Sequence, residues 1–219
     1  QNIGAYGAEA KDVIEKVEMF AVDNCSQVIL ANQYCDFGYR DSVFKGALKG
    51  KVVITAVVFL LGREPSPMLG YGDLRDRTEA MGGPTLANIR QAVIDIRREK
   101  LPDPAVEGNA GSFFKNPLVD ETYARKLKGI YEDMPLYPCA EPGKVKLAAG
   151  WLIDRSGWKG RSLGPVGVPD RQALVLVNKG RATGKAVLAL ARAVPVPYTP
   201  LTLPTIYPVS IPVVTGSLL

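Results

Sequence analysis

Histidine is absent from all 219 residues of the chain. The absence excludes a histidine general base, every Ser-His or Cys-His nucleophile pair and the common zinc sites that use imidazole. The three cysteines, Cys25, Cys35 and Cys139, are odd in number and show no CxxC spacing. They argue against a disulfide framework or a thiolate metal site and favour a reducing, cytoplasmic environment, so we expect no bound metal.

Excess charge and long apolar runs are also scarce. Lys and Arg outnumber Asp and Glu by 27 to 22, and this net charge of +5 is too small to indicate nucleic acid but suits an anionic small molecule. The longest apolar run, residues 52–61, is interrupted by Thr55 and is about half of the ~20 residues that a membrane span needs. No secretory signal follows Gln1, so we expect an internal part of a longer protein that contacts no membrane.

Residues 193–219 contain no charged residue and six prolines. Proline at this density breaks helices and cannot pair inside a sheet. Two interpretations remain open, a tail foreign to the native gene and a flexible natural extension. In neither do we expect catalytic residues there.

The preceding residues show the mixed pattern of an α+β fold. Apolar alternation and β-branched runs predict strands over 13–22 and 27–30, a well-buried strand over 52–61 and a buried strand over 173–177. The Leu-Pro-Asp-Pro turn at 101–104 is the expected boundary between two halves.

Four helices are expected from capping signals and apolar spacing. The first follows Thr85 and stops before Pro102. The second begins at Asp120 and ends before Pro135, with Tyr123, Leu127 and Ile130 directed inward. The third covers 147–155 and ends at Gly157, and the last covers 184–192 after Thr183.

Two polar turns lie in the first half. The segment QNIGAYG at 1–7 suits close backbone approach to a phosphate or planar ring, although a purely structural turn also explains it. No GxGxxG or GxxxxGK[ST] motif accompanies it, so a Rossmann site or P-loop has no support. In FGYRDSVFK at 37–45, Arg40 is either a surface ion-pair partner or a guanidinium fork for a carboxylate.

The strongest local signal is GNAGSFFKNP at 108–117, where Ser112 follows small residues and precedes two phenylalanines that would anchor the strand. Without histidine, Ser112 is a poor triad nucleophile. Its hydroxyl could donate a proton to a carbanion-like intermediate, or it could cap backbone groups of a turn.

Taken together, seven segments resemble one family: QNIGAYG (1–7), FGYRDSVFK (37–45), GYGDL (70–74), REKLPDP (98–104), GNAGSFFKNP (108–117), KLAAGWLID (146–154) and QALVLVN (172–178). The family is UDP-N-acetylenolpyruvoylglucosamine reductase, the FAD enzyme of the second step of bacterial peptidoglycan precursor synthesis. The resemblance covers about residues 1–192. The tyrosine of GYGDL indicates the subclass that folds such a loop over the substrate.

The resemblance implies an α+β fold of the vanillyl-alcohol-oxidase type. Residues 1–101 would be the C-terminal part of an incomplete FAD-binding domain, because the main loop that grips the FAD pyrophosphate would precede residue 1. Residues 102–192 would be an α+β substrate-binding domain, and 193–219 the uncharged tail. The resemblance further implies a cytoplasmic monomer.

The resemblance also implies FAD and NADPH as cofactors and UDP-N-acetylglucosamine enolpyruvate as substrate. In the family, reduced flavin delivers hydride to the β-carbon of the enolpyruvyl group. Ser112 matches the serine that protonates the α-carbon, and Arg40 matches the arginine that polarises the carboxylate. The matching substrate-binding residues are Tyr6, Tyr71, Lys100, Asn116 and Gln172. The residues implied beside the flavin are Gly4, Ala5 and Ile54.

Two departures from the family bear on activity. The family's third catalytic residue is a glutamate in a Leu-Glu-Pro-Glu-like motif, which should follow the last helix, where this chain has the run 193–219. Pro169 stands where many members have histidine. We therefore expect these 219 residues to be inactive by themselves. A non-catalytic UDP-sugar-binding remnant remains an alternative, as does another FAD-linked oxidase of the superfamily, against which Gly-Ser-Phe-Phe-Lys-Asn argues.

Overall fold

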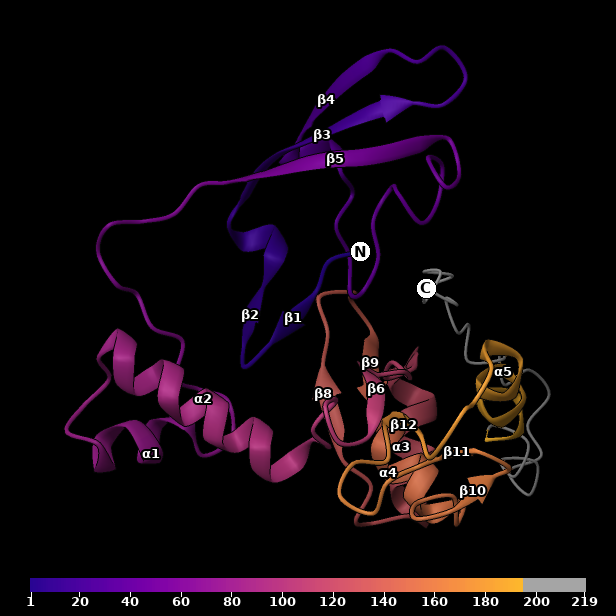
Figure 1. The fold of residues 1–219 in the computed structure, drawn as a ribbon. Helices are drawn as coiled ribbons and strands as arrows, with labels where there is room; N and C mark the ends of the chain where they lie inside the picture. The colour runs from indigo at the N-terminus through magenta and orange to yellow at the C-terminus, as the bar shows by residue number, and fades with distance from the viewer. Residues whose placement is uncertain (195–219) are drawn as a thin grey trace. The chain divides into compact units, whose positions relative to one another are not determined.

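The computed structural model describes residues 1–194. The chain forms two compact units, and the division lies between Ile96 and Arg97 (Figure 1). Both units mix helices with antiparallel sheets, so the predicted α+β class is confirmed. The charge-free run lies outside the described residues from 195 onward. Among the helices of the described part, none has the length and hydropathy needed to cross a membrane.

The first unit begins with a small hairpin and continues into a three-stranded sheet. Strands β1 (Gly4–Ala5) and β2 (Ala8–Glu9) form the hairpin, and a 3-10 turn (Ala10–Asp12) leads into the sheet. The sheet has the order β4 (Gln27–Ala31), β3 (Ile14–Ala21), β5 (Val52–Phe59), and a second 3-10 turn, η2 (Asn32–Tyr34), follows β4. The predicted strands at 13–22 and 27–30 are therefore confirmed.

The prediction that the strand over 52–61 is well buried is wrong. β5 is an edge strand, and the core of this sheet is centred on Val17, Met19 and Cys35. Val53 and Phe59 on β5 remain 58% and 51% exposed, because described residues cover little of the strand beyond its start. The apolar run therefore predicted the strand correctly but not its burial.

Two helices complete the first unit. α1 (Leu74–Ala80) and α2 (Leu86–Lys100) share a core of Leu69, Leu74, Ala92 and Ile96. The Thr85 hydroxyl accepts the Asn88 N–H at 3.1 Å, and α2 ends two residues before Pro102, as predicted.

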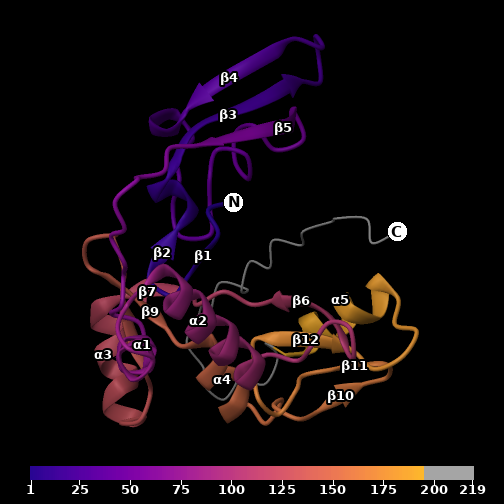
Figure 2. The same ribbon diagram turned by 60° about the vertical axis from the view of Figure 1, so that its left-hand side comes forward.

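The second unit contains two antiparallel sheets. One has the order β10 (Ser162–Leu163), β11 (Val166–Gly167), β12 (Val175–Asn178), β6 (Gly108–Ser112), with α5 (Gly184–Ala193) packed beside it (Figure 2). The other has the order β7 (Leu118–Asp120), β9 (Lys144–Leu147), β8 (Leu136–Pro138), and it packs with α3 (Glu121–Ile130) and α4 (Ala149–Arg155). The predicted buried strand near 173–177 is confirmed.

The helix predictions for this unit hold except at two points. Ile130 is 66% exposed rather than inward, because α3 ends there and Met134 occupies the core instead. α4 begins at Ala149, two residues later than predicted, because Leu147 pairs with Leu136 in the sheet. Thr183 caps α5 by accepting the Ala186 N–H at 3.3 Å, as predicted.

Candidate functional site

Arg40 lies in a tight turn of the first unit and contacts the start of the chain. Gly38 and Asp41 form a backbone bridge across the turn, and Arg40 between them has a φ of +54°. Its Nη1 donates to the carbonyl of Asn2 at 3.4 Å, and its Nη2 donates to the carbonyl of Gly4. The fold therefore brings Arg40 into contact with the turn at 1–7, which is distant from it in the sequence.

Gly4 is glycine because its neighbours within the protein leave no room for a side chain. A Cβ there would lie 2.9 Å from the Ala8 carbonyl oxygen and from Glu9 Cγ, and 3.0 Å from Arg40 Nη1. Contacts within the protein therefore require a glycine at this position of the turn. Ala5 beside it is exposed to solvent.

The two tyrosines predicted to bind substrate come together. Tyr6, with a φ of +54°, packs edge-to-face against Tyr71 with 5.4 Å between ring centroids. Tyr71 is 52% exposed in the loop before α1, so it remains accessible. Ile54 is 45% exposed on β5 opposite Met19, and β5 lies apart from the β1–β2 hairpin in both views (Figures 1 and 2).

In the second unit, Ser112 ends β6, and Gln172 lies three residues before the neighbouring strand β12. Ser112 ends β6 opposite Val175, and the next residue, Phe113, donates its N–H to the Leu174 carbonyl at 2.7 Å. The Gln172 side-chain oxygen accepts the Leu174 N–H at 3.4 Å. Ser112 is exposed, and its hydroxyl makes no hydrogen bond within residues 1–194, which leaves it free to donate and does not support the turn-capping interpretation.

The strand that ends at Ser112 is anchored as predicted. Phe114 is 6% exposed in the core, and the rings of Phe113 and Phe114 meet edge-to-face at 5.4 Å between centroids. Aromatic burial of this kind fixes the strand end that presents the serine hydroxyl.

Asn116 and Lys100 offer polar groups on other elements of this unit. The Asn116 Oδ1 accepts the N–H of Ala149, the first residue of α4, at 3.0 Å. Its Nδ2 has no partner among the described residues, so it can donate to a ligand. Lys100 is exposed at the end of α2.

Asn109 was not among the predicted site residues, although it controls the connection between Lys100 and Ser112. Its Nδ2 donates to the carbonyls of Pro102 and Glu107 at 3.2 and 3.0 Å, and its Oδ1 accepts the Gly111 N–H at 3.0 Å. The signal in the sequence was an asparagine flanked by glycine and alanine in a non-helical segment.

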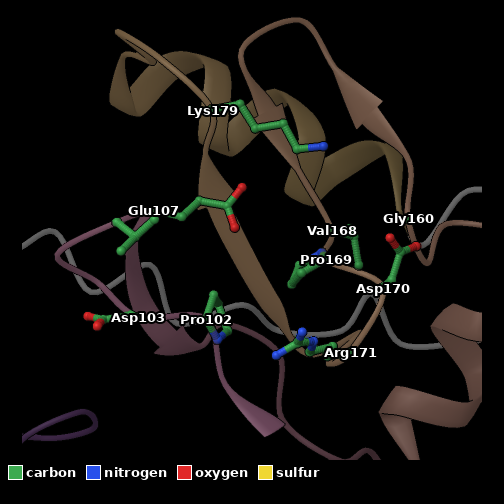
Figure 3. A pocket seen from close by; sticks show the side chains of 10 residues that line it. Pro102, Asp103, Glu107, Gly160, Val168, Pro169, Asp170, Arg171 and Lys179 are labelled. Atoms are coloured by element: carbon green, nitrogen blue, oxygen red, sulfur yellow. The ribbon is translucent and has the colours of Figure 1, made fainter. Parts of the chain in front are cut away.

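The second unit also contains a pocket of about 390 Å³ (Figure 3). Its lining combines apolar residues with charges of both signs: Pro102, Asp103, Val106, Glu107, Gly160, Val168, Pro169, Asp170, Arg171 and Lys179. Two of the lining residues are close in sequence to predicted site residues. Pro102 lies two residues after Lys100, and Arg171 directly precedes Gln172. One lining residue, Pro169, is a position at which the sequence departs from many members of the reductase family.

Electrostatics in the first unit centre on Glu9. Burial alone would raise its pKa, but hydrogen bonds from Asn2 and Lys11, together with the charges of Lys11 and Arg40, hold the pKa below its ordinary value. The Glu9 carboxylate is therefore ionised at neutral pH. No cluster of three or more Cys, Asp or Glu residues within 1–194 is arranged to hold a metal ion.

Comparison with known proteins identifies relatives of the chain. Residues 103–196 match the family described as UDP-N-acetylenolpyruvoylglucosamine reductase, C-terminal domain. The reductase of that name from Chromobacterium violaceum is 53% identical over 197 residues, 89% of this chain and 58% of the relative. The one from Pseudomonas aeruginosa is 50% identical over 196 residues, 89% of this chain and 57% of the relative.

A solved structure shows the same likeness in three dimensions. The crystal structure of UDP-N-acetylenolpyruvylglucosamine reductase from Thermus caldophilus aligns with a TM-score of 0.55 and 25% identity, covering 88% of this chain and 52% of that one. The chain spans about 58% of the length of the curated relatives it matches. The resemblance inferred from the seven segments is confirmed: the chain is homologous to UDP-N-acetylenolpyruvoylglucosamine reductases, and residues 103–196 match the family of their C-terminal domain.

Proposed function

We propose that the chain serves the reaction for which its relatives are named, the NADPH-driven, FAD-dependent reduction of UDP-N-acetylglucosamine enolpyruvate to UDP-N-acetylmuramate. It would do so in the cytoplasm, as a monomer, during peptidoglycan precursor synthesis. The observation that carries the proposal is the exposed Ser112 hydroxyl at the end of β6, within a segment that matches the reductase family. Residues 102–192 would be the substrate-binding domain, and 1–101 the C-terminal part of a vanillyl-alcohol-oxidase-type FAD-binding domain.

The second unit supplies groups suited to a UDP-sugar. Lys100 presents a point charge for the diphosphate, and the unused Nδ2 of Asn116 presents a hydrogen-bond donor. Gln172 would add its side-chain amide from the segment before β12. In the first unit, the exposed Tyr71 would close over the substrate with Tyr6 behind it.

Arg40 and Ser112 would divide the chemistry between charge and proton. Arg40 would polarise the enolpyruvyl carboxylate and so stabilise negative charge that develops at the α-carbon. Ser112 would then donate its hydroxyl proton to that carbon, completing the saturated product. The serine alkoxide would be reprotonated from solvent, because its hydroxyl is exposed.

Residues of the first unit are compatible with a flavin at its ring end. Ala5 is small and exposed, so it can contact a planar ring. Ile54 lies on β5, apart from the β1–β2 hairpin (Figures 1 and 2), and its exposed apolar side chain would contact another part of the cofactor. When bound and reduced by NADPH, FAD supplies the hydride. Gly4 would contribute by allowing Arg40 to approach, because its missing side chain leaves room for the guanidinium.

The third catalytic group of the family has no counterpart in residues 193–219, which contain no acidic residue. Loss of one transition-state electrostatic group commonly lowers a rate by ~10²–10³. These 219 residues would therefore bind the UDP-sugar without efficient turnover.

Titration calorimetry with the enolpyruvyl UDP-sugar tests the binding part of the proposal. Heat is expected with the wild-type chain and a tenfold or greater loss of affinity with Lys100→Ala. Arg125→Ala on α3 is the matched control, since it removes an exposed basic residue from outside the predicted site. Absence of both heat and a thermal shift would contradict binding.

Activity is tested in a chimera in which the remaining sequence of the Chromobacterium violaceum relative flanks residues 1–192. The chimera should be yellow and should oxidise NADPH only when the enolpyruvyl UDP-sugar is present. Ser112→Ala should abolish this oxidation while flavin remains bound. A chimera that binds FAD but ignores the substrate would contradict the proposed function.

A further inference from the structure

Asn2 is a buried polar residue whose side chain joins three segments of the first unit. Its exposed fraction is 0%. The Nδ2 group donates to Glu9 Oε2 at 2.9 Å and to the Gly38 carbonyl at 3.0 Å, and Oδ1 accepts the Lys11 N–H at 3.0 Å. Because water does not reach the amide, loss of Asn2 would remove one hydrogen bond from each of these partners without a solvent replacement at that position.

One of these partners belongs to the turn that carries Arg40. The Gly38 carbonyl accepts both the Asn2 Nδ2 and, at 3.4 Å, the Asp41 N–H that closes the turn. Arg40 inside the turn has a φ of +54°, a conformation that a residue with a side chain keeps only where its surroundings impose it. Asn2 is therefore bonded to the segment whose shape sets the direction of Arg40.

Asn2 contacts Arg40 a second time through its own backbone. The Asn2 carbonyl accepts Arg40 Nη1 at 3.4 Å, while the Gly4 carbonyl accepts Nη2. We infer that Asn2 is the positioning residue for Arg40, because it fixes both the 38–41 turn and one of the two carbonyls that the guanidinium binds. The catalytic meaning of this role rests on the proposed function, whereas the positioning itself does not.

Glu9 explains why the residue is asparagine rather than aspartate. An ionised carboxylate only accepts hydrogen bonds, so the Nδ2 side of the amide must face Glu9, and Oδ1 then faces the Lys11 N–H. Lys11 also pairs with Glu9 through its Nζ at 3.2 Å. An aspartate in this place would set a carboxylate against the Glu9 carboxylate and against the Gly38 carbonyl.

The Asn2→Asp variant turns this requirement into a pH-dependent measurement. The charged groups of the surrounding segments are Glu9, Lys11, Asp12, Arg40, Asp41, Lys45 and the amino group of Gln1. Two facing carboxylates share a proton as the pH falls, and the protonated carboxyl can donate again. Arg40 should therefore be displaced in this variant at pH 7 and recover in mildly acidic solution.

Nuclear magnetic resonance of the full chain measures the displacement through the Arg40 guanidinium protons and the Gly4 and Gly38 amides. The wild type should show hydrogen-bonded, slowly exchanging Nη protons at neutral pH. Asn2→Asp should lose them at pH 7 and regain them as the pH is lowered and the paired carboxylates take up a proton. Unchanged Arg40 signals in Asn2→Asp at pH 7 would overturn the inference.

Asn32→Asp is the matched control. Asn32 Nδ2 donates to the carbonyls of Lys11 and Ile14 at 2.8 and 2.7 Å, in the same unit but without contact to Gly38 or Arg40. This variant should lose stability yet retain the Arg40 signals. If it loses them as Asn2→Asp does, the effect is general loosening and the inference fails.

A measurement on the wild type covers the case in which Asn2→Asp does not fold. The Asn2 Nδ2 protons and the Asp41 amide should exchange with solvent in one opening event, at rates within about threefold of each other. Rates that differ by more than tenfold would overturn the inference. No substrate or flavin enters these experiments, so failure of the calorimetric test would contradict the proposed function and leave this result standing.

Discussion

At the scale of single residues, Asn116 combines a structural acceptor with an unused donor. Asn116→Ala removes the acceptor for the first N–H of α4 and should lower the free energy of unfolding by about 1 kcal/mol. Asn116→Asp keeps the acceptor, so stability should change by less than about 0.5 kcal/mol while affinity for the UDP-sugar falls. Urea unfolding and calorimetry separate the two roles, and an unaltered stability in Asn116→Ala would contradict the first.

Glu9 should make the stability of the first unit depend on acidic pH. Its pKa is lowered in the folded state, so it contributes stability above its ordinary pKa of 4.5, and the contribution is lost as the pH falls through the lower folded pKa. Melting temperatures from pH 6 to 3 should therefore fall less steeply in Glu9→Gln than in the wild type. Glu121→Gln is the control, because that carboxylate makes a long, exposed 4.0 Å pair. Parallel curves for wild type and Glu9→Gln would contradict the prediction.

At the scale of elements, the end of α4 shows how a glycine terminates a helix. Gly157 has a φ of +70°, and its N–H donates to the Asp154 carbonyl at 2.8 Å. Gly157→Ala should cost about 1 kcal/mol through backbone strain alone, because a Cβ meets nothing closer than 3.7 Å. Gly129→Ala inside α3 should instead stabilise by about 0.5–1 kcal/mol. Chemical denaturation of both variants checks the opposite signs.

The sheet of the first unit has an open apolar face. Register places Phe20 opposite Val53, with Ile29 two residues further along on the same face, and these side chains are 44%, 58% and 54% exposed. Replacing Ile29 and Val53 by Thr should reduce the binding of a fluorescent apolar dye and leave the free energy of unfolding within about 0.5 kcal/mol. Dye fluorescence with urea unfolding tests this, and unchanged fluorescence would contradict it.

At the scale of the whole molecule, the two units should respond differently to ligand. Lys100, Asn116 and Gln172 all lie in the unit that begins at Arg97. The enolpyruvyl UDP-sugar should therefore raise the unfolding temperature of that unit. At a ligand concentration of 100 times Kd, binding stabilises the folded unit by about 2.7 kcal/mol. Differential scanning calorimetry with and without ligand measures the shift. A shift confined to the other unit, or one that Lys100→Ala does not reduce, would contradict the assignment.

Much of the secondary structure could be predicted because its causes are local. Thr85 and Thr183 accept N–H groups within their own first turns, and Gly157 supplies the left-handed conformation that ends α4. The failures have non-local causes. Leu147 left the predicted helix because Leu136, eleven residues earlier, pairs with it, and Ile130 is exposed because Met134 occupies the core.

The sequence by itself indicated the resemblance to UDP-N-acetylenolpyruvoylglucosamine reductases, because seven segments match that family in order, and it also identified Ser112 and Arg40 as candidates. Only the tertiary structure decided what surrounds them. Arg40 forms a hydrogen bond with Gly4, and Asn2 forms one with Gly38. In each pair the two residues are 36 positions apart in sequence, so no local pattern encodes the contact. The openness of β5 was likewise decided by the fold: alternation specifies a strand, but burial depends on which neighbouring elements cover it.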